Sequence, residues 1–245
     1  MSRYRATVEY DGTDYHGFQI QVGLPTIQEE LERALARITG QEVRVNGAGR
    51  TDAGVHALGQ VIAFDVRWRH SSAELQRALN AVLPTAIAVQ ELAEAAEGFH
   101  PRFDAVSRTY RYTVLNQPWR SPLAARFAHH VAMPLNVAAM NEAAAVLIGR
   151  HDFAAFGQPP QGENTVRQVW RAGWQREGVW CRFDIEADAF LRGMVRSLVG
   201  TMLLVGQGLL SVAEFVAVLA SGDRGRAAPP APPCGLCLME VKYGR

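Results

Sequence analysis

The hydrophobic and polar positions in the first part of the chain predict four strands and two helices. Alternating or apolar runs bounded by turn residues are typical of strands, and apolar residues spaced three and four apart are typical of amphipathic helices. Each predicted helix begins with a capping box, a Ser or Thr followed three residues later by Glu. The boxes are Thr26 with Glu29 and Ser71 with Glu74. The predicted order is strand 3–10, helix 26–40, strand 42–45, strand 61–66, helix 71–84 and strand 87–92.

The second part of the chain repeats this order. Its predicted strands are 109–115, 166–174, 179–185 and 236–243, and its predicted helices are 137–148, 190–205 and a short extra helix capped by Ser211 with Glu214. The β-α-β-β-α-β order is that of ferredoxin-like folds, and finding it twice indicates an internal duplication. The prediction is therefore an α+β protein of two tandem ferredoxin-like, or RRM-like, domains with antiparallel sheets. We place these domains at 1–104 and 105–245, with an active-site cleft between them. The Pro/Ala-rich stretch 224–233 is expected to be an ordered surface connection with little regular structure.

The two halves differ most at the glycine-rich segment Asn46–Gln60, where the second half has only a tight turn at Gly178. The segment reads NGAGRTDAGVHALGQ, and its four glycines indicate a shaped loop. It presents Arg50, Asp52 and His56. Two readings of Asp52 fit: a catalytic carboxylate facing a cleft, or an Asx turn in which the side chain caps its own backbone. Phosphate-loop and dinucleotide patterns fail, because the segment has no lysine and carries Asp52 where a small residue is needed.

Composition narrows the class of protein without naming a function. The chain has 245 residues, is 48% hydrophobic and carries a formal net charge of +1, as expected of a globular protein. It has no apolar run that could span a bilayer and no apolar signal region after Met1, so we expect a cytoplasmic protein with no membrane contact. Lys242 is the only lysine. Arginine binds phosphate in a fork that lysine lacks, but high genomic GC content would give the same bias.

Three cysteines raise the question of a metal or disulfide. Cys234 and Cys237 form a C-x-x-C pair, and only Cys181 remains to help them. Structural zinc needs four ligands. The pair also precedes a predicted strand instead of a helix, so we expect no metal site and no disulfide.

Three further residues could carry chemistry. Tyr110 alternates with Arg111 on a predicted strand, where it could stack on a base or fill the core with its hydroxyl satisfied. Arg192 and Arg196 are four apart in an apolar predicted helix and would share a face. Arg192 could reach solvent, whereas Arg196, deeper in the run, needs an anion.

These motifs resemble the tRNA pseudouridine synthase A family. The resemblance is carried by GRTDAGVHALGQV around Asp52, SRTYRY around Tyr110 and FLRGMVR ending at Arg196. It implies that Asp52 is the essential aspartate and that Arg196 pairs with it. It also implies that Tyr110 is the active-site tyrosine, which stacks on the target uracil and could help proton transfer. FHPRF, with Pro101 in place of the usual alanine, resembles a further family motif and makes Arg102 a candidate partner of phosphate or aspartate. Arg167 also falls on a family position, whereas Arg192 falls at a variable position of its motif. His56 could hold the glycine-rich segment or touch RNA, and with Arg50 these residues complete the expected substrate-binding set.

The resemblance implies isomerisation of uridines 38 to 40 in the tRNA anticodon stem-loop by a homodimer without metal or cofactor. The alternative is a non-catalytic RNA-binding protein of two RRM-like domains. Against it, the strand 61–66 lacks the aromatic-rich pattern of RNA-binding RRM sheets, and a binder has no need of the glycine-rich segment.

Overall fold

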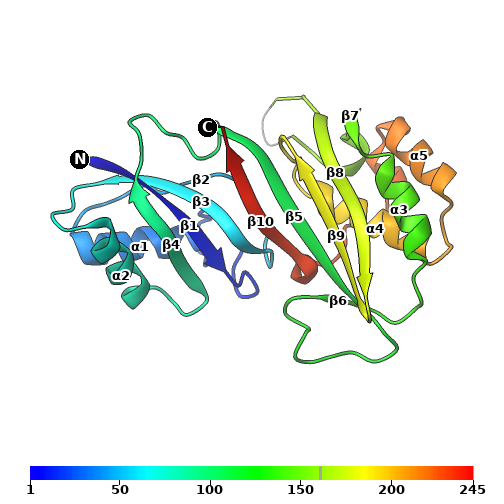
Figure 1. Cartoon of the computed structure of the whole chain (residues 1–245), viewed down its shortest axis with the longest axis horizontal. Helices are drawn as coiled ribbons and strands as arrows, with labels where there is room; N and C mark the ends of the chain where they lie inside the picture. The colour runs from blue at the N-terminus through cyan, green and yellow to red at the C-terminus, as the bar shows by residue number, and fades with distance from the viewer. Residues whose placement is uncertain (160–161, 245) are drawn as a thin grey trace. The chain divides into compact units, whose positions relative to one another are not determined.

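The computed structural model describes residues 1–159 and 162–244, and the chain divides into two compact units (Figure 1). The first unit comprises residues 1–106 together with the C-terminal strand from Leu238 on, and the second comprises 107–237. Both contain strands and helices, and nearly all strand pairs within them are antiparallel. β5 and β6 form a parallel pair. The prediction of an α+β protein with antiparallel sheets is confirmed, while the assignment of two tandem ferredoxin-like domains at 1–104 and 105–245 stays a prediction.

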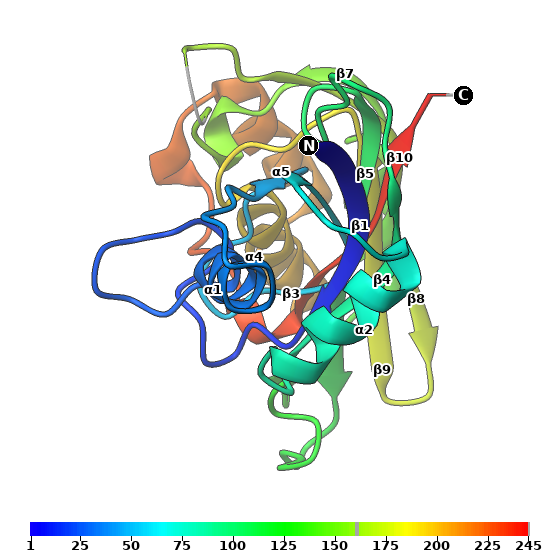
Figure 2. The same ribbon diagram turned by 90° about the vertical axis from the view of Figure 1, so that its left-hand side faces the viewer.

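The first unit is built on a sheet in the order β4-β1-β3-β10, with β2 pairing with β3. Its helices α1 and α2 contact one another, and α2 packs against β4 (Figure 2). A Cβ on Gly59 of β3 would lie 2.3 Å from Met239 O of β10, so glycine allows these strands their close approach. The elements are β1 (Ser2–Tyr10), α1 (Ile27–Thr39), β2 (Asn46–Gly47), β3 (His56–Val66), α2 (Ser72–Val82), β4 (Ile87–Glu94) and β10 (Leu236–Tyr243).

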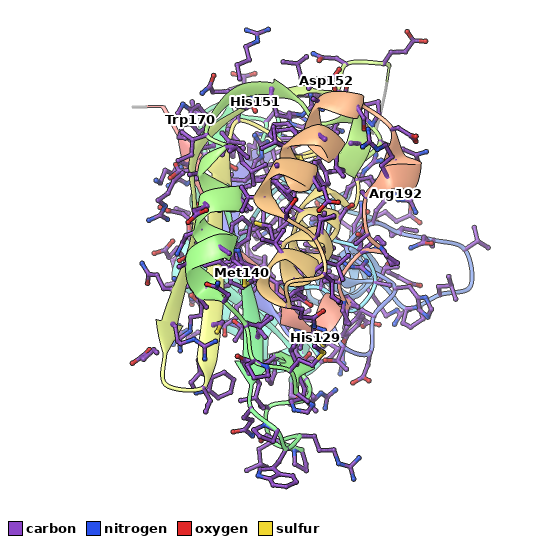
Figure 3. All side chains as sticks on the ribbon, turned by 90° about the vertical axis from the view of Figure 1, so that its right-hand side faces the viewer. His129, Met140, His151, Asp152, Trp170 and Arg192 are labelled. Carbon is purple, nitrogen blue, oxygen red and sulfur yellow. The ribbon has the colours of Figure 1, made fainter. Side chains whose placement is uncertain are left out.

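The second unit has a sheet in the order β5-β9-β8-β7, and α3 packs against β8 (Figure 3). The helices α3, α4 and α5 contact one another, with fully buried Met140 of α3 against Gly206 of α4. The elements are β5 (Ala105–Asn116), β6 (His129–Val131), α3 (Val137–Ala145), β7 (Gly149–Asp152), η1 (Ala154–Phe156), β8 (Val166–Glu177), β9 (Trp180–Ala187), α4 (Met194–Gly206), α5 (Val212–Ser221), η2 (Arg224–Arg226) and η3 (Pro233–Gly235).

Two of the three predicted capping boxes form in full, and the one at Thr26 forms only in its first half. Ser71 and Ser211 each form both halves of a capping box, with Glu74 and Glu214. The Thr26 hydroxyl accepts from Glu29 N, and the Glu29 carboxylate binds Arg33. Bonding to Ser71 and Ser211 lowers the pKa of Glu74 and of Glu214 below their ordinary value.

The strand predicted at 42–45 is wrong. These residues have no regular structure, although Val43 and Val45 are buried. Side chains of α1 take the backbone groups that a sheet would otherwise pair: Val45 N donates to Glu32 Oε1 at 3.0 Å, and Gln28 Nε2 donates to Val45 O at 2.9 Å. The alternation of Val43 and Val45 with polar residues therefore reflects packing next to α1, not pairing with another strand.

Several other boundaries differ from the prediction, and two of these differences affect candidate site residues. β3 begins at His56, so the end of the glycine-rich segment is strand. The predicted helix 190–205 begins only at Met194, because Gly193 has a left-handed φ of 74° and interrupts the helical backbone. Within the described residues, no helix is long and apolar enough to cross a membrane.

Candidate functional site

The glycine-rich segment places Asp52 on a braced turn of the first unit. On its N-terminal side, Thr51 Oγ1 lies 2.9 Å from the Tyr10 hydroxyl, and Thr51 O accepts from Phe18 N at 3.1 Å. Gly17 packs directly on this backbone: at its φ of 92°, a Cβ would lie 2.5 Å from Thr51 O. The turn is therefore held by β1 and by the loop that follows β1.

The backbone at Asp52 does not form an Asx turn. An Asx turn would bring the Gly54 N–H to the Asp52 carboxylate. That N–H instead donates to Tyr15 O at 3.2 Å, while Val55 N donates to Asp52 O. The turn is closed by backbone groups, and the partly buried Asp52 side chain is not used to cap the Gly54 N–H.

Gln60 braces the other end of the segment. Its side chain is fully buried, with Nε2 donating to Gly49 O at 2.8 Å and Oε1 accepting from Gly49 N at 3.2 Å. These two bonds hold the backbone just before Arg50, which is exposed. Sequence reasoning missed Tyr10, Gly17 and Gln60. The available signal was a glutamine between Gly59 and Val61 in an apolar strand.

His56, in the same segment, is buried at the start of β3. Its Nδ1 accepts from Gly12 N at 3.1 Å and lies 3.2 Å from Asp11 Oδ1. Gly12 must approach closely here, since a Cβ on it would lie 2.0 Å from Val55 O. These contacts support a positioning role for His56, and its predicted contact with substrate stays a prediction.

In the second unit, Tyr110 lies on β5 opposite Ile185 of β9. It is 8% exposed, and its ring meets Phe190 edge-on at 5.0 Å between centroids. Tyr112, on the same face, is fully buried and donates its hydroxyl to Pro232 O at 2.8 Å, and burial raises its pKa. Arg111 points to the other face and forms a two-bond ion pair with Asp184 at 2.8 and 3.0 Å. The predicted alternation is confirmed.

Arg196 lies in the first turn of α4. Its Nε donates to Ala231 O at 2.7 Å, and Ala231 N donates back to Arg196 O at 2.9 Å. These bonds tie the helix to the Pro/Ala-rich connection, where Ala231 is buried. The pairing of Arg196 with Asp52 stays a prediction.

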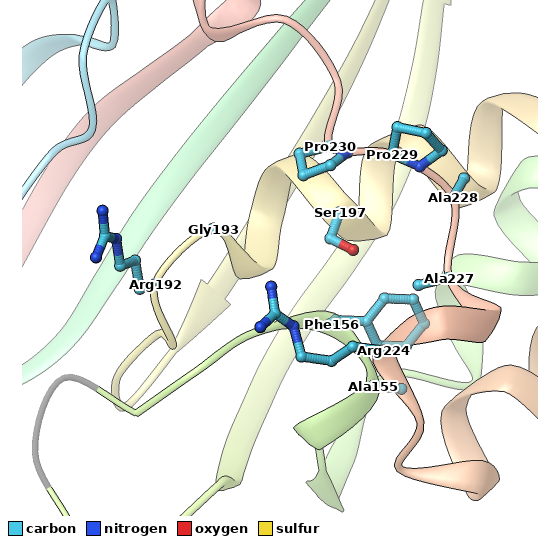
Figure 4. A pocket seen from close by; sticks show the side chains of 10 residues that line it. All are labelled: Ala155, Phe156, Arg192, Gly193, Ser197, Arg224, Ala227, Ala228, Pro229 and Pro230. Atoms are coloured by element: carbon cyan, nitrogen blue, oxygen red, sulfur yellow. The ribbon is translucent and has the colours of Figure 1, made fainter.

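Arg192 does not share a helical face with Arg196, so that expectation is wrong. Arg192 precedes the helix, separated from it by Gly193, and forms an isolated two-bond bridge with Gln158. Its side chain is exposed and lies at the edge of a pocket described below (Figure 4).

The remaining predicted substrate contacts lie in different settings. Arg167 is 9% exposed, and its Nη1 donates to Asn164 O and Val166 O. Burial lowers the pKa of Arg167, an effect that Asp188 partly offsets. Arg102 lies with its guanidinium 5.7 Å from the Phe103 ring centre. The substrate-binding roles of Arg50, Arg102, Arg167 and Arg192 stay predictions.

In residues 1–159 and 162–244, no group of three or more His, Cys, Asp or Glu side chains is placed to hold a metal ion. Cys181 and Cys234 are free thiols, and burial raises the pKa of both. His151 and Asp152, adjacent on β7, each bond to nearby backbone: His151 Nε2 lies 3.0 Å from Ile148 O, and Asp152 Oδ1 accepts from Ala154 N (Figure 3).

Comparison with known proteins gives a consistent picture. A family model described as tRNA pseudouridine synthase matches residues 6–104 and 143–244, which include Asp52 and Arg196 but not Tyr110. The chain is 40% identical over 244 residues to tRNA pseudouridine synthase A of Thermoanaerobacter sp. strain X514, covering 99% of this chain and 100% of that protein. It is 44% identical over 245 residues to tRNA pseudouridine synthase A of Rhodospirillum rubrum, covering 99% and 88%.

Among solved structures, the chain matches a crystal structure of a Cbf5-Nop10-Gar1 complex. The TM-score is 0.39 with 13% identity, over 96% of this chain and 48% of that chain. A likeness at this level supports no inference about fold or function.

Proposed function

The chain belongs to the tRNA pseudouridine synthase A family, and from this premise we propose that it isomerises uridines 38 to 40 of the tRNA anticodon stem-loop with Asp52 as nucleophile. The protein is an isomerase acting on uridine in tRNA. The choice of Asp52 is supported by its place in GRTDAGVHALGQV, and the braced turn is the observation that carries it. A nucleophile must be held in a narrow range of positions, and the bonds to Tyr10, Phe18 and Tyr15 hold the backbone on both sides of Asp52.

The reaction breaks the N1–C1′ glycosidic bond, turns the uracil and joins its C5 to C1′. The C5 proton leaves, and N1 gains a proton, so no atoms are lost overall. The Asp52 carboxylate can form a covalent intermediate either by adding to the base or by attacking C1′. Both routes need an ionised carboxylate. We propose that the Arg196 guanidinium pairs with the Asp52 carboxylate and orients it for attack.

Tyr110 is proposed to stack on the uracil. The base must leave the helical stack to be reached, which costs a few kcal/mol, and stacking on an aromatic ring offsets part of that cost. The support is the position of Tyr110 on β5, where the strand and Phe190 fix the plane of its ring.

The wider assignments are proposals of the same kind. We propose a homodimer in the cytoplasm, two ferredoxin-like domains, and a catalytic cleft between them to which Asp52, Tyr110 and Arg196 all contribute. Their support is family membership and the repeated order of elements in the sequence.

Tritium release tests the proposal. Full-length protein is incubated with tRNA labelled with tritium at uracil C5, and wild type is compared with Asp52→Asn and a control, Asp14→Asn, in the exposed turn after β1. We expect release from wild type and the control, none from Asp52→Asn, and tRNA binding by all three. Binding by wild type without release supports the RNA-binding alternative, and release by Asp52→Asn shows that another residue is the nucleophile. Sequencing of the modified positions checks the assignment to 38–40.

A further inference from the structure

The second unit contains a pocket of about 220 Å³ between the first turn of α4, η1 and the connection that follows α5 (Figure 4). None of its ten lining residues is acidic, and two of them, Arg192 and Arg224, are arginines. Within the described residues, neither arginine is in an ion pair, and both are exposed. Arg224 therefore contributes positive charge to the pocket, and Arg192 contributes it at the rim (Figure 4).

The helix adds to this charge. α4 has 13 residues and begins at the pocket, with Gly193 as its N-cap. Gly193 has no side chain to cap the first turn, and the N–H groups at a helix N-terminus favour an anion. The backbone N–H groups alone do not make a binding site. The side chain of Ser197, in the first turn of α4, is a second group suited to an anion.

Ser197 is 7% exposed. In the part of the chain that the structure describes, its hydroxyl makes no hydrogen bond. Figure 4 shows the hydroxyl directed into the pocket, on the side of Arg224. The hydroxyl oxygen itself keeps some exposure to the pocket, so a ligand that enters the pocket can reach it. A hydroxyl in the pocket lined by Arg224 is suited to an oxyanion, while Figure 4 shows the Arg192 guanidinium at the rim and turned away from Ser197.

The walls of the pocket are fixed before any ligand binds. A Cβ on Gly200 would lie 2.2 Å from Pro229 O, so the connection lies directly on α4. Ala228 N donates to Thr201 Oγ1 at 3.1 Å, which anchors the connection further along the helix. On the other side, the bridge to Gln158 fixes the backbone of Arg192. Such preorganisation lowers the entropic cost of binding.

We propose that this pocket binds a phosphodiester group of the tRNA backbone, an inference that rests on the proposed function. The substrate is a polyanion, and arginine forks, a serine hydroxyl and a helix N-terminus are the groups that commonly contact nucleic-acid phosphates. A contact of this kind positions the RNA without reading its sequence. Arg192, Ser197 and Arg224 are thus binding residues, apart from the chemistry at Asp52.

The experiment measures binding of full-length protein to an anticodon stem-loop by fluorescence anisotropy at several salt concentrations. We expect the double variant Arg192→Gln/Arg224→Gln to bind more weakly, with the slope of log K against log salt reduced by roughly 1 to 2. Ser197→Ala removes a donor but no charge, so its affinity should fall with an unchanged slope. The control is Arg182→Gln, because Arg182 is an arginine of the same unit already paired with Glu177.

The outcomes separate this inference from the proposed function. A double variant that binds with the affinity and slope of the Arg182→Gln control, while wild type still releases tritium, overturns the pocket alone. A wild type that neither binds tRNA nor releases tritium overturns both. Inorganic phosphate provides a last check through the thermal unfolding midpoint. If phosphate stabilises wild type but not the double variant while RNA binding is the same in both, the pocket takes free phosphate and the RNA assignment is wrong.

Discussion

The hydroxyl of Tyr10, at the end of β1, lies 2.9 Å from Oγ1 of Thr51, the residue before Asp52. Both residues are buried, and Gln60 Nε2 reaches the same tyrosine oxygen at 3.5 Å. The end of the first strand is thus bonded to the turn that carries the proposed nucleophile. Stability and activity should therefore change together when this contact is altered.

Tyr10→Phe removes one hydroxyl from this contact and leaves the ring in place. Loss of a buried hydrogen bond should lower the free energy of unfolding by about 1 kcal/mol. We also expect kcat for tritium release to fall, because the backbone before Asp52 is less restrained, with little change in tRNA affinity. Urea unfolding and single-turnover kinetics measure the two effects. Unchanged kcat in a variant that is measurably less stable would show that this bond contributes to folding only.

Gln60→Leu tests the other brace. The substitution keeps the approximate size of the side chain but leaves both Gly49 backbone groups without their partner, which should cost about 1–3 kcal/mol of unfolding free energy. Its control is Gln90→Leu, because Gln90 is an exposed glutamine of β4 bonded to the surface residue Glu9. We expect the control to stay near wild type in chemical denaturation. Equal losses in the two variants would contradict the bracing role.

Gly17→Ala tests the packing of the loop on the turn. Gly17 and Gly23 both have positive φ, at 92° and 75°, so alanine is strained at either position by roughly 1–2 kcal/mol. Only at Gly17 would the new Cβ lie against Thr51 O, since Gly23 has open space. Gly17→Ala should therefore be the less stable variant in urea and the less active one in tritium release, and equal behaviour of the two variants would refute the close packing.

His129 predicts a pH dependence of stability in the second unit. Burial, and then the neighbouring His130, lowers the pKa of His129 below its ordinary value of 6.5 (Figure 3). Below that value the unfolded chain binds more protons than the folded protein, so stability should fall as pH drops from 6.5 towards the lowered pKa. His129→Gln should weaken this dependence, whereas replacement of the exposed His70 by Gln should leave it unchanged. Thermal unfolding midpoints between pH 5 and 8 measure the difference, and parallel curves for wild type and His129→Gln would count against it.

The sequence predicted the helix caps and the family motif correctly, because these features depend on residues only a few positions apart. The capping boxes at Ser71 and Ser211 form as predicted, since serine and glutamate three residues apart satisfy each other within one turn. The last strand has the predicted bounds. The motif around Asp52 identified the family for the same reason, being a continuous stretch.

Contacts between distant parts of the chain decided features that the hydrophobic pattern of the sequence does not contain. Val43 and Val45 alternate with polar residues as in a strand, yet side chains of α1 form the hydrogen bonds to the Val45 backbone. An alternation of period two cannot distinguish a strand in a sheet from an extended segment packed on a helix. The sequence pattern places Gly193 inside an apolar helix. In the structure Gly193 has a positive φ, so the helix begins at Met194 and Arg192 lies before it. Arg192, Ser197 and Arg224 line one pocket, although Arg224 is 32 residues from Arg192 in the sequence. Residue spacing determined the elements and the family, whereas hydrogen bonds between distant segments decided where the side chains meet.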